Sequence, residues 1–174
     1  MPALDDIAAV KYPDPLAQFV SMSAAVGSKV VELQPGEDLD TLLRSLFPEA
    51  VNIASNLPET GIANRNPDTV GSAAELDGTD VGVIRGSIGV AENGCIWVPQ
   101  TMKERAVCFI SEQLVILLSK DSIVSNMHEA MKLIRVGEYG YGCFISGPSK
   151  TADIAQVLVM GAQAARSLTV VLLP

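Results

Sequence analysis

The stretch AVCFISEQLVILL at residues 106–118 decides the fold class. It holds two continuous apolar runs, Ala106–Ile110 and Leu114–Leu118, separated by three polar residues. Strands with one solvated face alternate apolar and polar residues, whereas unbroken apolar runs are typical of strands covered on both faces in a parallel sheet. Segments with helical apolar spacing lie before and after these runs. The sequence therefore predicts an α/β fold with a mostly parallel sheet flanked by helices.

One domain is predicted for residues 1–174, because the chain shows neither an internal repeat nor a linker. The best-defined helix follows Asp14, a capping residue, with Pro15 at its first position and Gly27 at its end. The predicted helices cover residues 14–27, 39–47, 122–135 and 154–165, and the predicted strands cover residues 29–33, 50–54, 81–98, 106–110, 114–118, 143–146 and 168–173. Residues 55–79 have little periodicity and are expected to be a long irregular segment.

The charge of the chain is unevenly distributed. Its net charge is −8, made up of −9 in residues 1–80 and +1 in residues 81–174. An acidic protein repels phosphate backbones and anionic lipids, so we expect no nucleic-acid and no membrane partner. An anionic ligand is expected to bind the nearly neutral second half.

The three cysteines and the first residues indicate the compartment. Cys95, Cys108 and Cys143 are odd in number and widely spaced, which is typical of a reducing environment. The start of the chain has neither a basic segment nor a long apolar segment that would predict a signal peptide. We therefore expect a cytoplasmic protein without a disulfide framework, and no iron–sulfur cluster held by this chain alone.

The strongest local motif is SGPSKTAD at residues 146–153. It lies between a predicted buried strand and a predicted helix, where the free N–H groups of a helix start attract anions. The predicted ligand- or anion-binding residues of this motif are Ser146, Gly147, Ser149, Lys150, Thr151 and Asp153. The glycine spacing of a Walker A motif is absent. The alternative interpretation is an ordinary capped loop.

A second motif, VAENGCI at residues 90–96, places Glu92 alone in an apolar, glycine-rich region. Such a carboxylate is either a structural acceptor for backbone N–H groups or a catalytic base or nucleophile, and Glu92 is the candidate catalytic residue. Asn93, Gly94 and Arg85 are candidate anion-binding residues, although an arginine at the position of Arg85 is more often a solvated turn residue. The only histidine, His128, is expected to face solvent, so the sequence predicts neither a Ser-His-Asp relay nor a metal site.

Three segments resemble the LUD-domain proteins, the lactate-utilisation protein C family. The segment ISGPSKTADIAQVLVMGAQAARSLTVVLL at residues 145–173 is similar to the closing signature of that family. VGVIRGSIGVAENG at residues 81–94 and ERAVCFISEQLVILLSKDSIV at residues 104–124 resemble earlier family segments. The resemblance implies a fold similar to the NagB/RpiA/CoA-transferase superfamily. It also implies a role beside iron–sulfur partner proteins, which would hold the clusters, in oxidising L-lactate to pyruvate.

The chain departs from the family pattern at three positions. Asn93 stands where the family has threonine, and Leu114 and Gln163 stand where it has histidine. The AENG segment also resembles the SENG element of class I CoA-transferases, in which a glutamate at the position of Glu92 forms a glutamyl thioester.

Three functions therefore remain open for the chain. The first is an accessory subunit of a lactate-oxidising complex. The second is a transferase or hydrolase that acts on a small carboxylate or thioester through Glu92. The third is a non-catalytic module that binds a small carboxylate or phosphorylated metabolite. In each case we expect the site where the Glu92 turn meets the loop at residues 146–153.

Overall fold

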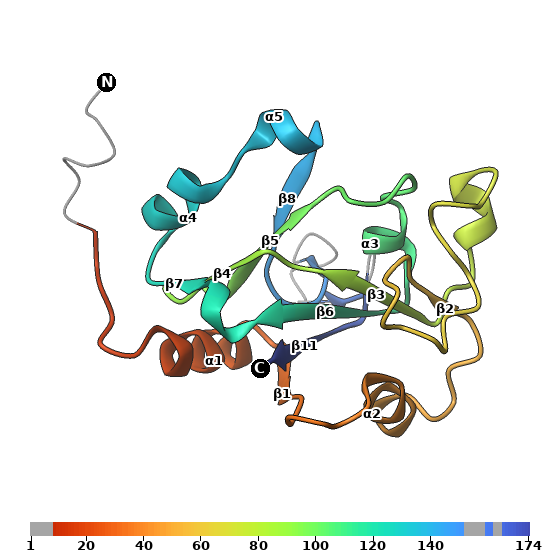
Figure 1. The fold of residues 1–174 in the computed structure, drawn as a ribbon, viewed down its shortest axis with the longest axis horizontal. Coiled ribbons are helices and arrows are strands. Elements are labelled where there is room, and N and C mark those ends of the chain that lie inside the picture. Colours follow the sequence, from red (N-terminus) through yellow and green to blue (C-terminus); the bar gives the residue numbers. More distant parts are fainter. Residues whose placement is uncertain (1–8, 152–158, 162–164) are drawn as a thin grey trace.

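Five parallel strands form the central sheet of the computed structural model (Figure 1), in which residues 9–151, 159–161 and 165–174 are described. The order of the strands is β1-β11-β6-β3-β2. They span Lys29–Glu32 (β1), Ser167–Leu173 (β11), Gln113–Ser119 (β6), Val81–Arg85 (β3) and Ile53–Ala54 (β2). Five consecutive residues are buried in both β6 and β11, so both faces of these strands are covered. The predicted parallel sheet is confirmed.

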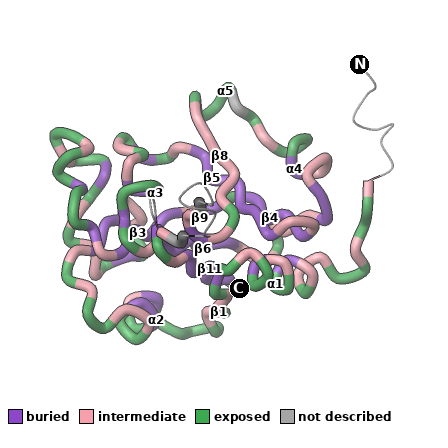
Figure 2. Tube along the Cα trace, turned by 180° about the vertical axis from the view of Figure 1, so that it is seen from behind, coloured by how far each residue is buried: buried purple, intermediate pink, exposed green. Residues whose placement is uncertain are grey.

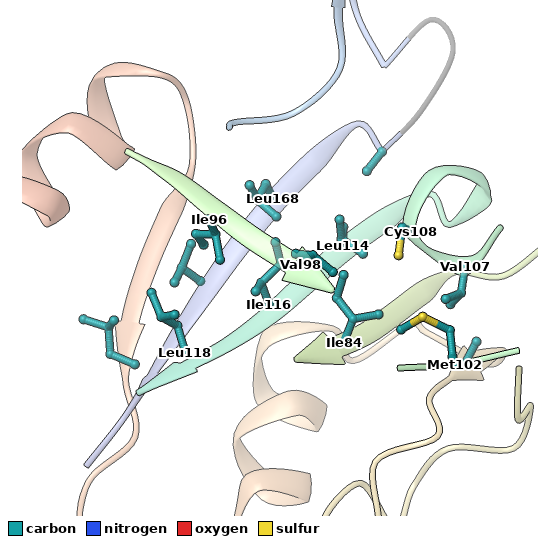
Figure 3. Packing of buried hydrophobic residues seen from close by; sticks show 14 of the residues in the cluster. Ile84, Ile96, Val98, Met102, Val107, Cys108, Leu114, Ile116, Leu118 and Leu168 are labelled. Atoms are coloured by element: carbon teal, nitrogen blue, oxygen red, sulfur yellow. The ribbon is translucent and has the colours of Figure 1, made fainter. Parts of the chain in front are cut away.

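The two faces of this sheet pack against different layers. Val83, Val115 and Leu117 point to one face, where they pack against α2 (Leu39–Leu46). Ile116 and Leu118 belong to the opposite face, which packs against α1 (Pro15–Ala25) and a second sheet (Figure 3). The buried central strands contrast with the largely exposed outer surface of the helices (Figure 2).

The second sheet has four short strands in the order β7-β4-β5-β8. They span Ile123–Val124 (β7), Ile88–Val90 (β4), Cys95–Pro99 (β5) and Gly142–Ile145 (β8). β5 runs antiparallel to both β4 and β8, whereas β7 is parallel to β4. Helix α4 (Met127–Leu133) covers the outer face of the second sheet. Its residue Ala130 packs there beside the tilted ring pair of Trp97 and Phe144. The molecule is therefore layered as α2, parallel sheet, second sheet with α1, and α4.

Short elements complete the described chain. They are the 3-10 helices η2 (Ala73–Leu76) and η3 (Lys120–Ser122), the helices α3 (Val107–Ile110) and α5 (Val136–Tyr139), and the two-stranded ribbon of β9 (Lys150–Thr151) and β10 (Val159–Met160). Apart from η2 and one isolated bridge at Arg65, residues 55–79 are irregular, as predicted. In the ranges that the structure describes, no helix is long and apolar enough to cross a membrane.

Several predicted elements were wrong. The apolar run Ala106–Ile110 is not a strand, because it forms the single helical turn α3 with only Val107 and Cys108 buried. The helix expected at residues 122–135 begins only at Met127, where Asn126 caps it, and Ile123–Val124 adds a strand to the second sheet instead.

The helix expected at residues 154–165 lies mostly outside the described residues. Its two central positions, Val159–Met160, are described and form strand β10 rather than a helical turn.

Candidate functional site

The turn between β4 and β5 meets the loop that follows β8. The pairing of Ile96 with Ile145 brings the start of β5 beside the end of β8. The Ser146 hydroxyl then donates a hydrogen bond to the carbonyl oxygen of Asn93, over 3.3 Å. The two predicted motifs are thus in contact at these residues, and we call residues 92–94 and 146–149 the turn–loop junction.

The carboxyl end of α1 supports both halves of the junction. Gly94 has φ +66°, and a β-carbon added there would lie 2.8 Å from the backbone nitrogen of Ser23. Gly147 has φ +70°, and its added β-carbon would overlap the carbonyl oxygen of Val26. Both positions therefore need glycine, because the backbone is left-handed and because another backbone lies against it.

Lys150 contacts the same helix end. Its ammonium donates a hydrogen bond to the carbonyl oxygen of Val26, the residue that caps α1. A cation at a helix carboxyl end is favourable, because the unpaired carbonyls there carry partial negative charge. The structure thus gives Lys150 a structural partner, and its predicted role in anion binding stays a prediction.

The loop at residues 146–149 lies at the amino end of the parallel sheet. The Ser149 amide donates to the carbonyl of Ala165, two residues before β11, over 3.0 Å. We expected a helix start at the carboxyl end of a main-sheet strand. That expectation was wrong because β8 belongs to the second sheet, and because Lys150–Thr151 forms β9. Asp153, the last predicted residue of this motif, lies outside the described residues.

Glu92 is fixed at the start of α4. Its carboxylate accepts a hydrogen bond from the Met127 amide over 3.3 Å, and its own amide donates to the Ser125 carbonyl over 3.0 Å. The side chain is therefore a structural acceptor for a helix start, and its catalytic role stays a prediction. The pKa of the Cys95 thiol is raised to about 11, chiefly by burial and in smaller part by the negative charge of Glu92.

Arg85 lies away from the junction. It occupies the carboxyl end of β3, whereas the junction lies near the amino ends of β1 and β11. Its guanidinium forms an ion pair with Glu59, and burial lowers its pKa. The structure therefore does not unite Arg85 with the other predicted site residues.

Sequence reasoning missed a buried serine beneath the junction. Ser23, on α1, is fully buried next to Gly94, and in the described part of the chain its hydroxyl has no hydrogen-bond partner. An unpaired buried hydroxyl is costly, so it marks a place where water or a ligand atom can be bound. In the sequence, the one sign that Ser23 is buried is its position four residues after Phe19, which places both residues on the same face of the helix.

A cavity of about 230 Å³ adjoins the loop half of the junction. Its described lining includes the hydroxyl-bearing residues Ser146 and Ser149 and the apolar residues Phe109, Phe144 and Leu168. Such a mixture of apolar walls and a few polar groups is typical of a small-molecule site. Within the described ranges, no group of three or more His, Cys, Asp or Glu side chains is arranged to hold a metal ion.

The protein is thus an α/β protein in which two sheets pack together. Its turn–loop junction lies against the carboxyl end of α1 and depends on two glycines. Residues 72–173 match the family model of the LUD domain, and that match covers more than half of the chain. The chain belongs to the LUD-domain family.

Two curated relatives share a similar stretch of sequence. The lactate utilization protein C of Shouchella clausii is 33% identical over 102 residues, which are 55% of this chain and 44% of that protein. The lactate utilization protein C 1 of Bacillus mycoides is 34% identical over 89 residues, which are 47% of this chain and 38% of that protein. The matched part thus spans less than half the length of these relatives.

A solved structure has the same fold. The crystal structure of a DUF162 family protein from Deinococcus radiodurans superposes with a TM-score of 0.73, at 16% sequence identity. The superposition covers 95% of this chain and all of that one.

Proposed function

We propose that this protein is a cytoplasmic accessory subunit in the oxidation of L-lactate to pyruvate, acting with iron–sulfur partner proteins. The observation that carries the proposal is the LUD-domain match over residues 72–173, which includes both halves of the turn–loop junction. The names of the two curated relatives, both lactate utilization proteins C, support it.

The proposed role of the chain is to hold a small carboxylate beside the junction. The oxidation removes two electrons and two protons from L-lactate, and the clusters of the partner proteins would take up the electrons. Ser146 and Ser149 are polar residues of the described lining of the adjacent 230 Å³ cavity. The Ser149 hydroxyl is suited to donate to a carboxylate, and the Ser146 oxygen, whose proton goes to the Asn93 carbonyl, is suited to accept from a ligand hydroxyl. The apolar side chains of the same lining would exclude water from the bound ligand.

Affinity purification tests the partnership. A tagged chain is isolated from cells of the source organism grown on L-lactate, and the co-purifying proteins are identified by mass spectrometry. We expect iron–sulfur proteins to be enriched over the same purification from pyruvate-grown cells. Recovery of the chain alone from lactate-grown cells would contradict the proposal.

A Ser146→Ala chain separates ligand orientation from assembly. It removes one cavity hydroxyl and one junction hydrogen bond. We expect it to recover the same partners but to support slower lactate oxidation in the purified assembly. A Ser87→Ala chain is the matched control, because Ser87 is an exposed serine between β3 and β4 and does not line this cavity.

A further inference from the structure

A larger cavity, of about 490 Å³, lies between α3 and the segment that follows β5. Its described lining residues all fall between Ala73 and Ile110, and they include Gln100, Lys103, Arg105 and Phe109. Its volume falls within the range of small-molecule sites, about 300–1,000 Å³. Ser146–Ser149 do not line it, and Phe109 is the one described lining residue that it shares with the 230 Å³ cavity beside the turn–loop junction.

The two large apolar side chains of the described lining are exposed and lie on one helical turn. In α3, Val107 and Cys108 point into the core (Figure 3), whereas Phe109 and Ile110 remain 40% and 38% exposed. Two adjacent large apolar residues at the mouth of a cavity offer a surface that an apolar group can cover.

The polar wall carries an oriented cation. The Arg105 guanidinium stacks over the Tyr141 ring at 4.4 Å, and it donates a hydrogen bond to the Gln100 side chain over 3.5 Å. Gln100 is held in turn, because its amide donates to the carbonyls of Met102 and Lys103. A guanidinium that is held in this way loses little conformational freedom when it binds an anion.

The charge balance of the lining is positive in an acidic protein. Lys103 and Arg105 contribute two positive charges, and Glu104 contributes the one negative charge among the described lining residues. The Lys103 ammonium is fixed at the carbonyl of Val70, over 2.8 Å. The chain as a whole has a net charge of −8, so this local excess favours an anionic ligand.

We propose that this cavity binds a small organic anion with an aromatic or branched apolar body. The carboxylate or sulfonate of the ligand pairs with Arg105, and its apolar body packs against Phe109 and Ile110. The single methyl group of lactate would leave most of the cavity unfilled, so this ligand differs from that of the proposed function. The inference does not depend on the proposed role in lactate oxidation.

Two fluorescent probes of similar shape test the site. Anilinonaphthalene sulfonate carries an anionic group, whereas N-phenyl-1-naphthylamine has the same aromatic body without charge. We expect the sulfonate to bind the purified protein at one saturable site and more tightly than the neutral probe. Arg105→Gln should raise the Kd of the sulfonate about tenfold and leave that of the neutral probe within about twofold. Phe109→Ser should raise both values about fivefold or more.

Matched variants at two residues outside the described lining of this cavity serve as controls. Arg135→Gln removes an exposed arginine near α4, and Leu133→Ser removes a large apolar side chain of α4 that is 56% exposed. Neither should change the Kd of either probe, and Arg105→Lys should partly restore sulfonate binding. Equal binding of the two probes, binding that the Arg105 and Phe109 substitutions leave unchanged, or no saturable binding to a folded protein would each overturn the proposal.

Discussion

At the scale of single residues, the turn–loop junction depends on glycines that lie against the end of α1. Gly94→Ala adds a methyl group 2.8 Å from the Ser23 nitrogen and places alanine at φ +66°. We expect the free energy of unfolding to fall by about 2–4 kcal/mol, because backbone strain and overpacking act together.

Gly78→Ala is the matched control for this prediction. Gly78 has φ +68°, but an added β-carbon would meet nothing within 4 Å, so only the backbone strain remains. We expect a loss of about 1 kcal/mol for Gly78→Ala. Equal losses in urea denaturation of the two variants would show that the close approach to α1 is unimportant.

The structural role of Glu92 gives a second prediction. Glu92→Gln retains an oxygen that can accept the Met127 amide, whereas Glu92→Ala removes it. We expect Glu92→Ala to lower the free energy of unfolding by about 1 kcal/mol more than Glu92→Gln does.

The same pair of variants tests Glu92 as a nucleophile. Hydroxylamine or borohydride would trap a glutamyl thioester after incubation of the wild-type protein with acyl-CoA. If Glu92 is only structural, no adduct forms in any of the three proteins. An adduct in the wild-type protein that is lost in Glu92→Gln would establish the transferase alternative instead.

Two buried thiols predict how stability depends on pH. Burial raises the pKa of Cys95 to about 11 and that of Cys108 to about 12, from an ordinary value of 9.0. Above pH 9 the unfolded chain therefore binds fewer protons than the folded chain, so the free energy of unfolding falls as the pH rises. Replacing both cysteines with alanine should flatten this decline between pH 9 and 11, measured by thermal unfolding. A decline as steep as that of the wild type would contradict this explanation.

At the scale of elements, the cap of α4 also holds the first described residues. The Asn126 side chain accepts the Glu129 amide over 3.0 Å, and it donates to the Val10 carbonyl over 2.8 Å. Asn126→Ala should lower the free energy of unfolding by about 1–2 kcal/mol, and Asn126→Ser should cost less because serine retains the cap. Both variants lose the bond to Val10, so both should be cleaved faster by trypsin after Lys11. Unchanged cleavage would show that Asn126 does not anchor this segment.

The elements that could be predicted are those whose pattern is local. Leu114–Leu118 and Leu168–Leu173 are strands because each continuous run is long enough to be covered on two faces. The run Ala106–Ile110 is also continuously apolar, but it forms one helical turn in which tertiary packing buries only Val107 and Cys108. The second sheet could not be separated from the first, since short buried strands in either sheet have the same apolar pattern.

At the scale of the whole molecule, the contact between the two motifs was predictable but its surroundings were not. Asn93 and Ser146 meet because their strands are neighbours in one sheet, as we expected. Gly147 lies against Val26 at the end of α1, more than a hundred residues earlier in the sequence. A local sequence pattern cannot predict a contact over such a separation. The similarity to the NagB/RpiA/CoA-transferase superfamily and the location in the cytoplasm stay predictions.

Growth on L-lactate tests the proposed function most directly. The gene is deleted in the source organism, and growth rates are measured with L-lactate or pyruvate as the only carbon source. We expect deletion to abolish growth on L-lactate and to leave growth on pyruvate unchanged, and we expect the wild-type gene to restore growth on L-lactate. Growth of the deletion strain on L-lactate at the wild-type rate would contradict the proposed function.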